Sequence, residues 1–223
     1  MLSPVMEDYL KAIYKLQLEH DGRVSTSSIA EVMDVTPPTV TSMLEKLEAR
    51  ELIDREKYAG VRLTPEGEQV ALEVIRHHRL LETFLTEHLD FDWSDVHDEA
   101  DRLEHHISEE LERRVASRLE DPTVDPHGAP IPSADLKPLE MRPGKTLTAF
   151  DPGTTVEVRQ VSDHDREILD YLADHGIVPG ERLTIVEIAP FGMVTVETTA
   201  GESVSLPEDI AATVRASECQ LTN

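Results

Sequence analysis

Apolar residues recur at helical spacing through the first third of the chain, separated by short polar breaks. The stretch 5–18 predicts an amphipathic helix. Its apolar positions are Met6, Leu10, Ile13 and Tyr14. Ser25 or Thr26 can cap a short second helix carrying Ile29 and Met33, because a side-chain hydroxyl accepts a hydrogen bond from an otherwise unpaired amide. Two short helices are therefore expected before residue 36.

A third helix is predicted to begin after Thr36. Thr36 suits the N-cap, and Pro37 suits the first helical position, where an N–H would be unpaired in any case. Its buried face is expected to carry Val40, Leu44 and Leu47. Two helices joined by a short turn, followed by alternating strands at 52–56 and 61–64, match a winged helix-turn-helix.

The middle of the chain predicts two more helices. Thr64-Pro65 repeats the cap-then-proline pattern and begins a helix that ends near Leu89, and 96–106 predicts another. Long helices following a winged module commonly form a dimer interface, and DNA half-sites one helical turn apart need such a two-fold pair. We therefore expect a homodimer.

The last hundred residues change character. Residues 121–145 are rich in proline without any periodic pattern, which predicts an extended tether. Strands are predicted at 155–161, 182–189, 193–199 and 203–206, with a short helix at 165–175. Short strands separated by glycine turns indicate a small β-barrel.

Composition narrows the functional class. The net charge is −24, yet residues 1–65 carry 8 Lys+Arg against 11 Asp+Glu, so the first third is the part best suited to approach a polyanion. A folded chain this acidic is typical of proteins adapted to high salt, and we expect a halophilic source. The single cysteine, the absence of a long apolar run and the N-terminal sequence indicate a cytoplasmic protein with no membrane segment.

Two clusters of imidazole and carboxylate groups supply candidate metal ligands. On a helix spanning 96–106, the side chains of His97, Asp101, Glu104 and His105 would share one narrow stripe. His77, His78 and Glu82 form a second cluster on the preceding helix. The sequence contains neither the HExxH pattern of zinc proteases nor a CxxC pair. Charged helices with scattered histidines are also common as solvated surfaces, so that alternative stays open at this point.

Several motifs occur together: Met-Glu-Asp-Tyr-Leu at 6–10 with Ile13-Tyr14, Thr-Pro-Pro-Thr-Val at 36–40, Glu-Lys-Tyr at 56–58 with Gly60, His-Arg-Leu-Leu-Glu at 78–82, and the segment 96–106. With this combination the chain resembles the diphtheria-toxin-repressor family of metal-dependent transcriptional regulators, over most of residues 1–132. The resemblance implies a homodimeric winged-helix repressor of a double-stranded DNA operator, with Fe(II) or Mn(II) as corepressor. The fold class is then mainly α with small β: a winged helix-turn-helix domain (1–64), a helical dimerisation and metal-binding domain (65–121), a proline-rich linker (122–145) and an SH3-like, ferrous-transport-type barrel (146–223).

The resemblance also implies ligand sets. One family site matches Asp8, Asp101, Glu104 and His105, and an ancillary site matches His78, Glu82 and His97. Asp125 and His127 resemble a segment that donates ligands in some manganese regulators, with Asp125 in place of a cysteine. In the barrel domain, Asp163, His164 or Asp165 are further candidates, although Asp163 is expected rather to cap a helix.

Two departures from the family pattern bear on the metal. Iron-responsive members usually have Met and Cys at the positions of Asp8 and Asp101, and oxygen donors favour a harder ion such as Mn(II). Lys11 stands where short manganese-sensing relatives place a carboxylate, which argues against a paired-manganese site. We expect the metal-free carboxylates to repel one another, and a divalent ion to tie the first helix to the dimerisation helix.

The DNA-contacting residues are predicted from the exposed face of the third helix and from the wing. We expect Thr36, Pro38, Thr39 and Ser42 to contact base edges or the nearby DNA backbone, and Lys46 lies on the same face of the helix. Lys57 and Arg62 are expected to contact phosphates. Three alternatives remain: a helical hairpin that binds a protein, a winged-helix regulator that senses an organic ligand without metal, and a metal-dependent hydrolase. The hydrolase lacks an evident nucleophile, so the chain is not expected to be an enzyme.

Overall fold

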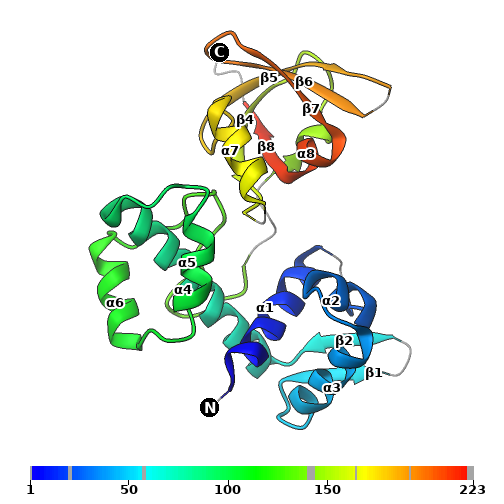
Figure 1. Cartoon of the computed structure of the whole chain (residues 1–223), viewed down its shortest axis with the longest axis vertical. Helices are drawn as coiled ribbons and strands as arrows, with labels where there is room; N and C mark the ends of the chain where they lie inside the picture. The colour runs from blue at the N-terminus through cyan, green and yellow to red at the C-terminus, as the bar shows by residue number, and fades with distance from the viewer. Residues whose placement is uncertain are drawn as a thin grey trace. The chain divides into compact units, whose positions relative to one another are not determined.

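The computed structural model describes residues 2–19, 22–56, 59–139, 144–163, 165–190 and 192–219. Its elements are α1 (Pro4–Glu19), α2 (Thr26–Val32), α3 (Pro37–Glu48), β1 (Ile53–Glu56), β2 (Gly60–Leu63), α4 (Pro65–Leu89), α5 (Val96–Leu103), α6 (Glu109–Arg118), β3 (Lys145–Thr146), the 3₁₀ helix η1 (Leu147–Ala149), β4 (Thr155–Val161), α7 (Arg166–Asp174), β5 (Arg182–Ile188), β6 (Met193–Thr198), β7 (Ser203–Pro207), α8 (Glu208–Thr213) and β8 (Val214–Glu218) (Figure 1). Two compact units result. The first comprises Met1–His78, Arg102–Arg114 and Ile131–Met141, and the second comprises Arg79–Asp101, Val115–Pro130 and Arg142–Asn223.

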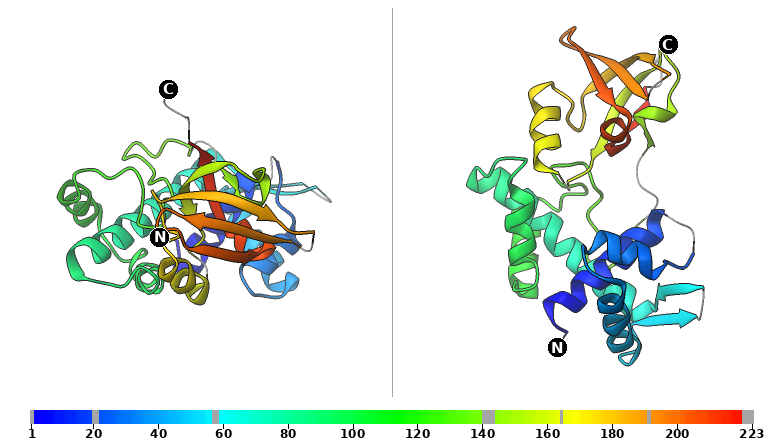
Figure 2. Two further views of the ribbon diagram at one scale, coloured as in Figure 1. Left: turned by 90° about the horizontal axis from the view of Figure 1, so that it is seen from above. Right: turned by 45° about the vertical axis from the view of Figure 1, so that its right-hand side comes forward.

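The first unit contains the predicted winged helix-turn-helix. Ser25 caps α2 by accepting a hydrogen bond from the Ser28 amide, and Thr36 lies at the N-cap of α3 with prolines in its first turn. The hairpin pairs β1 with β2 in antiparallel register and lies beside α3 (Figure 2). Its core buries the apolar stripes of all three helices, which include Leu10, Ile13, Ile29, Val40, Leu44 and Leu47. The pattern-based prediction of this module is confirmed.

Helix α4 also begins as predicted. The hydroxyl of Thr64 accepts a hydrogen bond from the Gly67 amide at 3.1 Å, which satisfies one of the unpaired N–H groups of the first turn. The backbone of Leu52 passes so close to Gly67 that a Cβ there would lie 2.9 Å from the Leu52 carbonyl carbon. A glycine at this position therefore lets the helix start directly against the end of α3 and the wing.

The expected helix at 96–106 is shorter than predicted. Helix α5 ends at Leu103, and Glu104 to His106 form a turn in which the His106 amide donates to the Leu103 carbonyl at 2.9 Å. Tertiary contacts end the helix: Nδ1 of His77 lies 3.1 Å from the Glu104 carbonyl oxygen, and the Glu104 carboxylate is buried. The prediction of one continuous stripe of four ligands was therefore wrong.

The second unit contains a six-stranded antiparallel sheet in the order β3-β8-β4-β5-β6-β7. Irregular register between Val158 and Gln160, and between Ile185 and Glu187, bends the sheet, because a bulge increases local twist. Helices α7 and α8 belong to the same domain (Figure 1), and their apolar faces enter one core with the strands. The predicted strands and short helix are all present, and the sheet curves into the expected small barrel.

Four elements of this domain were missed, namely β3, η1, α8 and β8. Helix α8 has six residues, too few to show a helical period, and β8 inserts between β3 and β4, to which it is distant in sequence. The cap of α7 was assigned to the wrong residue: the carboxylate of Asp165 accepts from the amides of Glu167 and Ile168, whereas Asp163 contacts His97. His164 lies outside the described residues.

The proline-rich segment is not a free tether. Asp125, His127, Ala129 and Ile131 are buried. In the first unit, the Arg76 guanidinium donates to the Pro132 carbonyl at 2.7 Å, and the Leu139 amide donates to the Tyr14 hydroxyl at 2.9 Å. In the second unit, the Val161 amide donates to the His127 carbonyl at 2.9 Å. Proline has no N–H to donate to a helix or a sheet, which disfavours both in this segment. Its carbonyl groups instead accept hydrogen bonds from side chains and from the backbone of β4.

Candidate metal centres and nucleic-acid interface

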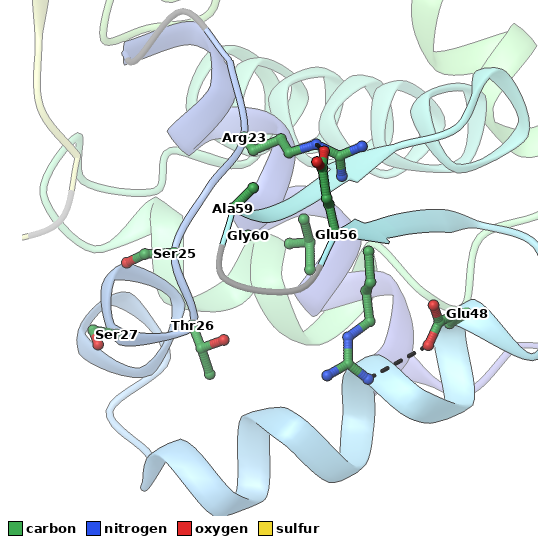
Figure 3. A pocket seen from close by; sticks show the side chains of 10 residues that line it. Arg23, Ser25, Thr26, Ser27, Glu48, Glu56, Ala59 and Gly60 are labelled. Atoms are coloured by element: carbon green, nitrogen blue, oxygen red, sulfur yellow. Dashed lines mark hydrogen bonds and ion pairs between the residues drawn. The ribbon is translucent and has the colours of Figure 1, made fainter.

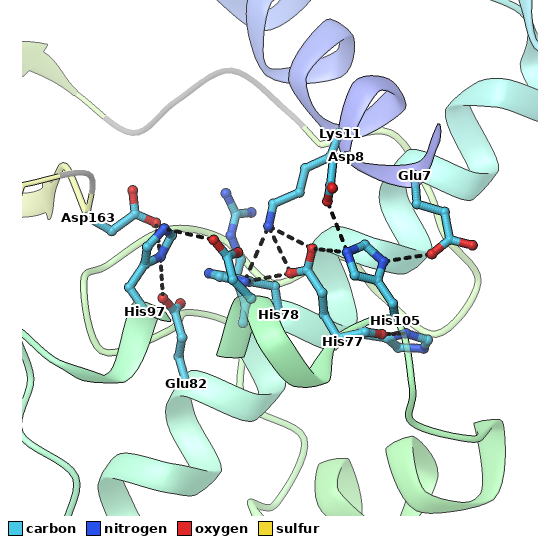
Figure 4. A network of polar contacts seen from close by, with 12 residues as sticks. Glu7, Asp8, Lys11, His77, His78, Glu82, His97, His105 and Asp163 are labelled. Atoms are coloured by element: carbon cyan, nitrogen blue, oxygen red, sulfur yellow. Dashed lines mark hydrogen bonds and ion pairs between the residues drawn. The ribbon is translucent and has the colours of Figure 1, made fainter. Parts of the chain in front are cut away.

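The first cluster of ligands lies in the first unit and joins α1 to the turn after α5. Asp8, Glu104 and His105 each offer one donor atom, and these atoms all lie within 4.8 Å of one another. His105 Nε2 is 2.9 Å from Asp8 Oδ1 and 3.4 Å from Glu104 Oε1 (Figure 4). Two carboxylates and an imidazole are a donor set that suits Mn(II) or Fe(II). The structure thus brings together three of the four residues predicted for the first site.

Lys11 and His78 surround the carboxylate of Glu104. Lys11 Nζ lies 3.0 and 2.8 Å from the two Glu104 oxygens, and His78 Nδ1 lies 2.6 Å from Oε2. Burial raises the pKa of Glu104, but the His78 hydrogen bond and the Lys11 charge outweigh it and lower the pKa below its ordinary value. The expected mutual repulsion of metal-free carboxylates is therefore largely offset at Glu104, a correction that the sequence did not anticipate.

Asp8 and His105 have a different electrostatic environment. Burial raises the pKa of Asp8, and the Glu104 charge raises it further, against the opposing effect of His105. His105 Nδ1 lies 2.7 Å from Glu7 Oε2, so a carboxylate holds the ring on the side away from Asp8. Such an outer carboxylate fixes the orientation of a metal-binding imidazole. Glu7 was missed as a site residue, although its position next to Asp8 was a usable signal.

The remaining predicted ligands of the two family sites are divided between the two units of the chain. His78 belongs to the first unit, where its Nδ1 contacts Glu104 as described, and it precedes Glu82 by one turn of α4. Asp101 belongs to the second unit, with a half-exposed carboxylate 3.6 Å from His97 Nε2. The contact between Asp101 and His97 therefore lies within the second unit.

A second cluster lies within the second unit. Glu82, Asp125 and His127 are all buried, and each offers a donor atom within 4.8 Å of the others. His97 Nδ1 lies 3.1 Å from Glu82 Oε1 and 3.5 Å from Asp163 Oδ2 (Figure 4). The weakest sequence candidates, Asp125 and His127, are thus grouped with Glu82. Asp163 is the one barrel-domain candidate among the described residues that joins them.

The loop that carries Asp125 is built to present its second oxygen. Asp125 Oδ1 accepts hydrogen bonds from the amides of His127 and Ala129, both at 2.9 Å. Oδ2 lies 3.4 Å from Arg79 Nε. His127 Nε2 is 2.9 Å from the Trp93 carbonyl oxygen, which turns Nδ1 toward Glu82 at 3.8 Å. Arg79 was not predicted as part of this site.

Two buried atoms in this cluster support a fit to a cation. Among the described residues, Asp125 Oδ2 and His127 Nδ1 are buried side-chain atoms without a hydrogen-bond partner. A buried polar atom that makes no hydrogen bond is costly, and a bound cation is one of the groups that can satisfy it. Carboxylate oxygens with imidazole nitrogen again suit Mn(II) or Fe(II). Both clusters therefore fit the metals that the sequence predicted.

The charges in the second cluster oppose one another. Burial raises the pKa of Asp125, and the Glu82 charge raises it further. For His127, burial lowers the pKa, but the nearby carboxylate of Glu82, with those of Asp125 and Asp163, outweighs it and raises the pKa to about 9. The metal-free protein therefore holds a proton on His127 as the counter-charge to these carboxylates.

This proton makes the stability of the metal-free protein depend on pH. A folded-state pKa of about 9, above the ordinary 6.5, gives a stabilisation that is complete below pH 6.5 and lost as pH rises through 9. Its full size is on the order of 3 kcal/mol. We expect the unfolding free energy of the chelated wild type to exceed that of His127→Gln most at pH 6.5, and the difference to shrink toward pH 9.

The check is denaturant unfolding of both proteins across this range. His175→Gln, at the end of α7, is the matched control, because the His175 ring contacts the Tyr171 carbonyl instead of carboxylates. A difference between wild type and His127→Gln that stays constant with pH would contradict the assignment.

The predicted DNA-contacting face is exposed in the first unit. The predicted residues of α3 and its cap, Thr36, Pro38, Thr39, Ser42 and Lys46, are all exposed, as are Pro37, Glu45 and Glu48. Arg62 is exposed on β2, but its Nε lies 3.2 Å from Asp54 Oδ2 on the paired strand. Lys57 lies outside the described residues. The predicted α3 residues are thus accessible, while Arg62 is already paired with a carboxylate.

A hollow beside the wing adds arginines that the sequence did not single out. It has a volume of about 680 Å³ and lies between the start of α2 and the hairpin (Figure 3). Arg23 pairs with Asp54 at 2.7 Å and with Glu56 at 3.2 Å, and Arg55 pairs with Glu48 at 3.5 Å. The arginines of this face are therefore held by carboxylates, as the acidic composition would suggest.

Comparison with known proteins decides the family. The model of the iron-dependent repressor N-terminal DNA-binding domain matches residues 1–61, that of the iron-dependent repressor metal-binding and dimerisation domain matches 64–133, and that of the FeoA domain matches 145–218. The iron-dependent repressor IdeR of Mycobacterium tuberculosis is 36% identical over 220 residues, covering 94% of this chain and 95% of IdeR. The chain belongs to the iron-dependent repressor family. The resemblance to diphtheria-toxin-repressor-type regulators is thereby confirmed.

Other relatives agree. The diphtheria toxin repressor of Corynebacterium glutamicum is 33% identical over 223 residues, covering 94% of each chain. A solved structure described as a manganese-dependent transcriptional repressor in complex with manganese superposes with a TM-score of 0.87 at 37% identity, covering 96% of this chain and 99% of that one. The predicted fold class is confirmed, and the chain is a metal-dependent, DNA-binding transcriptional repressor of this family. Among the described residues, the helices are too short or too polar to cross a membrane.

Proposed function

We propose that this iron-dependent-repressor-family protein is a cytoplasmic homodimer that binds its DNA operator when Mn(II) or Fe(II) occupies the first cluster, and that it controls genes of metal uptake. One observation carries the proposal. Asp8, within the match to the DNA-binding domain, offers an oxygen within 4.8 Å of the donor atoms of Glu104 and His105, within the match to the metal-binding and dimerisation domain. A cation held by all three joins two functional segments of the chain.

The residues of the cluster have separate tasks in this scheme. Asp8 and Glu104 provide charge, His105 provides a ring nitrogen, and Glu7 orients the His105 ring. A bound divalent cation would supply positive charge that both carboxylates share. Moving a population from mostly incompetent to mostly competent for DNA requires a differential affinity of roughly 5 kcal/mol, within the range of a multi-ligand metal site. The repressor function then follows from ligands that span α1 and the turn after α5.

Oxygen donors bias the choice of metal. Asp8 and Asp125 both place a carboxylate among the ligand candidates, and no described cluster contains a sulfur atom. Hard oxygen ligands favour Mn(II), whereas the general affinity order favours Fe(II) at a given site. We therefore propose that both ions activate the protein. The affinity for Mn(II) relative to Fe(II) is expected to be higher than in relatives that use sulfur ligands.

Removal of the metal is expected to abolish specific DNA binding. The test is an anaerobic fluorescence-anisotropy titration on a duplex selected from a random-sequence pool with the Mn(II)-loaded protein. We expect Mn(II) and Fe(II) each to raise duplex affinity by roughly 100-fold or more over chelated protein, because the ion biases the two-state equilibrium.

The outcomes separate the alternatives. Equal affinity with and without metal would favour a regulator that senses an organic ligand. Metal-dependent turnover of an ester or phosphoester, without an effect on DNA affinity, would favour the hydrolase. Magnesium in place of manganese is the control for nonspecific charge, since Mg(II) demands strict octahedral geometry and retains its water.

A further inference from the structure

Lys11 is a buried cation inside the first cluster, and the proposed function gives it no task. Its side chain is 11% exposed, and Nζ lies 3.0 and 2.8 Å from the two oxygens of Glu104. Nζ also lies 3.3 Å from His78 Nδ1 (Figure 4). Lysine is rarely buried unless it is paired, and here the partner is a candidate metal ligand. The contact therefore bears directly on metal binding.

The contacts of Glu104 leave little of its carboxylate unused. A carboxylate has about four lone-pair positions on its two oxygens. Lys11 engages both oxygens, and His78 Nδ1 lies 2.6 Å from Oε2. Oε1, the oxygen nearer to His105 at 3.4 Å, is one of the two that the ammonium engages. A cation held jointly by Glu104 and His105 must therefore compete with the ammonium for the carboxylate.

We propose that Lys11 is a positioning residue that acts as a tethered competitor of the metal ion, lowering the divalent-cation affinity of the first cluster and so raising the metal concentration at which the repressor is loaded. This rests on the proposed function. Two effects act in the same direction. The ammonium stabilises the metal-free carboxylate, and it repels a dication bound beside it, since like charges a few ångströms apart in a poorly screened site interact strongly.

The expected result concerns two measurements on the full-length protein. In Lys11→Met, which keeps the stem and removes the charge, we expect Mn(II) to bind about tenfold more tightly or better. We expect the metal-free variant to unfold roughly 5 °C lower than wild type, because Glu104 then lies buried without its counter-charge. The protein with Lys11 and the Lys11→Met variant are compared in a Glu82→Gln background, which removes a ligand candidate of the second cluster. Mn(II) affinity is measured by competition with a chelator.

Two controls separate the role of Lys11 from other causes. Lys15→Met, one turn further along α1, removes the same charge at a half-buried position and is expected to change Mn(II) affinity less than twofold. Asp8→Asn tests the cluster itself. If Asp8→Asn leaves Mn(II) binding unchanged, the ion is not in this cluster and the proposed function fails, whatever Lys11 does.

The proposal for Lys11 has its own contrary outcome. If Asp8→Asn weakens Mn(II) binding but Lys11→Met leaves it unchanged or weakens it, the ammonium is a support of the metal site rather than a competitor. Should Lys11→Met fail to fold without metal, Lys11→Gln is read by the same criterion, because its amide can still donate to Glu104. Lys11→Arg keeps the charge, and its guanidinium can still donate to the Glu104 carboxylate, so the variant is expected to retain the wild-type affinity within about threefold.

Discussion

Replacing Asp8 with asparagine is expected to weaken Mn(II)-dependent operator binding by about 100-fold or more while the protein stays folded. The carboxylate is 39% exposed and reaches the first cluster from α1, so its loss removes a ligand without opening a cavity. Asparagine keeps the size of the side chain but offers the ion a neutral oxygen. The measurement is the anisotropy titration with Mn(II), together with thermal unfolding of the metal-free protein.

Asp135→Asn is the matched control, because this carboxylate is 78% exposed in the same unit and pairs with Lys137. It is expected to leave the titration unchanged. Glu104→Ala would be a poorer test: Glu104 is 1% exposed, and its removal leaves the Lys11 ammonium buried without a carboxylate, which costs about 3–5 kcal/mol in comparable pairs. Metal-dependent binding by Asp8→Asn equal to that of the wild type would remove Asp8 from the mechanism.

Gly128→Ala is expected to destabilise the second unit by on the order of 3 kcal/mol or more. Gly128 has φ +83°, a region that costs any residue with a Cβ, and a Cβ there would overlap the carbonyl oxygen of Arg159 on β4. The loop would have to withdraw, and with it the hydrogen bond between the Val161 amide and the His127 carbonyl. Asp125 and His127 lie on this loop, so Mn(II) stoichiometry is expected to fall as well.

A matched glycine isolates the steric contribution. Gly153 has φ +88°, and a Cβ built there meets no atom within 4 Å. Gly153→Ala therefore carries only the backbone cost, about 1 kcal/mol. Denaturant unfolding and metal analysis of both variants test the argument, and equal losses for the two would show that docking of the loop against β4 contributes nothing.

Much of the DNA-binding module was predictable because the signals are local. A hydroxyl at Thr36 followed by prolines starts a helix wherever it occurs, and the spacing of Val40, Leu44 and Leu47 defines its buried face. The same reasoning placed the start of α4 at Pro65. Caps and periodicity act within one or two turns, so a linear pattern contains the information that determines them.

The candidate ligands were predictable by type but not by partner. Motif resemblance named Asp8, Glu104 and His105, and the fold brings their donor atoms together. For Lys11, the resemblance indicated only that a carboxylate present in short manganese-sensing relatives is replaced here. The structure shows that the Lys11 ammonium contacts both oxygens of Glu104. Contacts between residues about ninety positions apart leave no periodic signal, so the chemistry of a cluster was visible while its charge balance was not.

Local sequence thus specified the helices of the winged module, strands β4 to β7 of the barrel and the candidate metal ligands by residue type, since these depend on caps, alternation and side-chain chemistry. The folded chain alone specified where α5 stops, that β8 enters between β3 and β4, and that the proline-rich segment packs Asp125 and His127 beside Glu82. These features depend on burial and on pairing across long sequence separations. The surroundings of each residue then come from distant segments of the chain, which a local sequence pattern does not reveal.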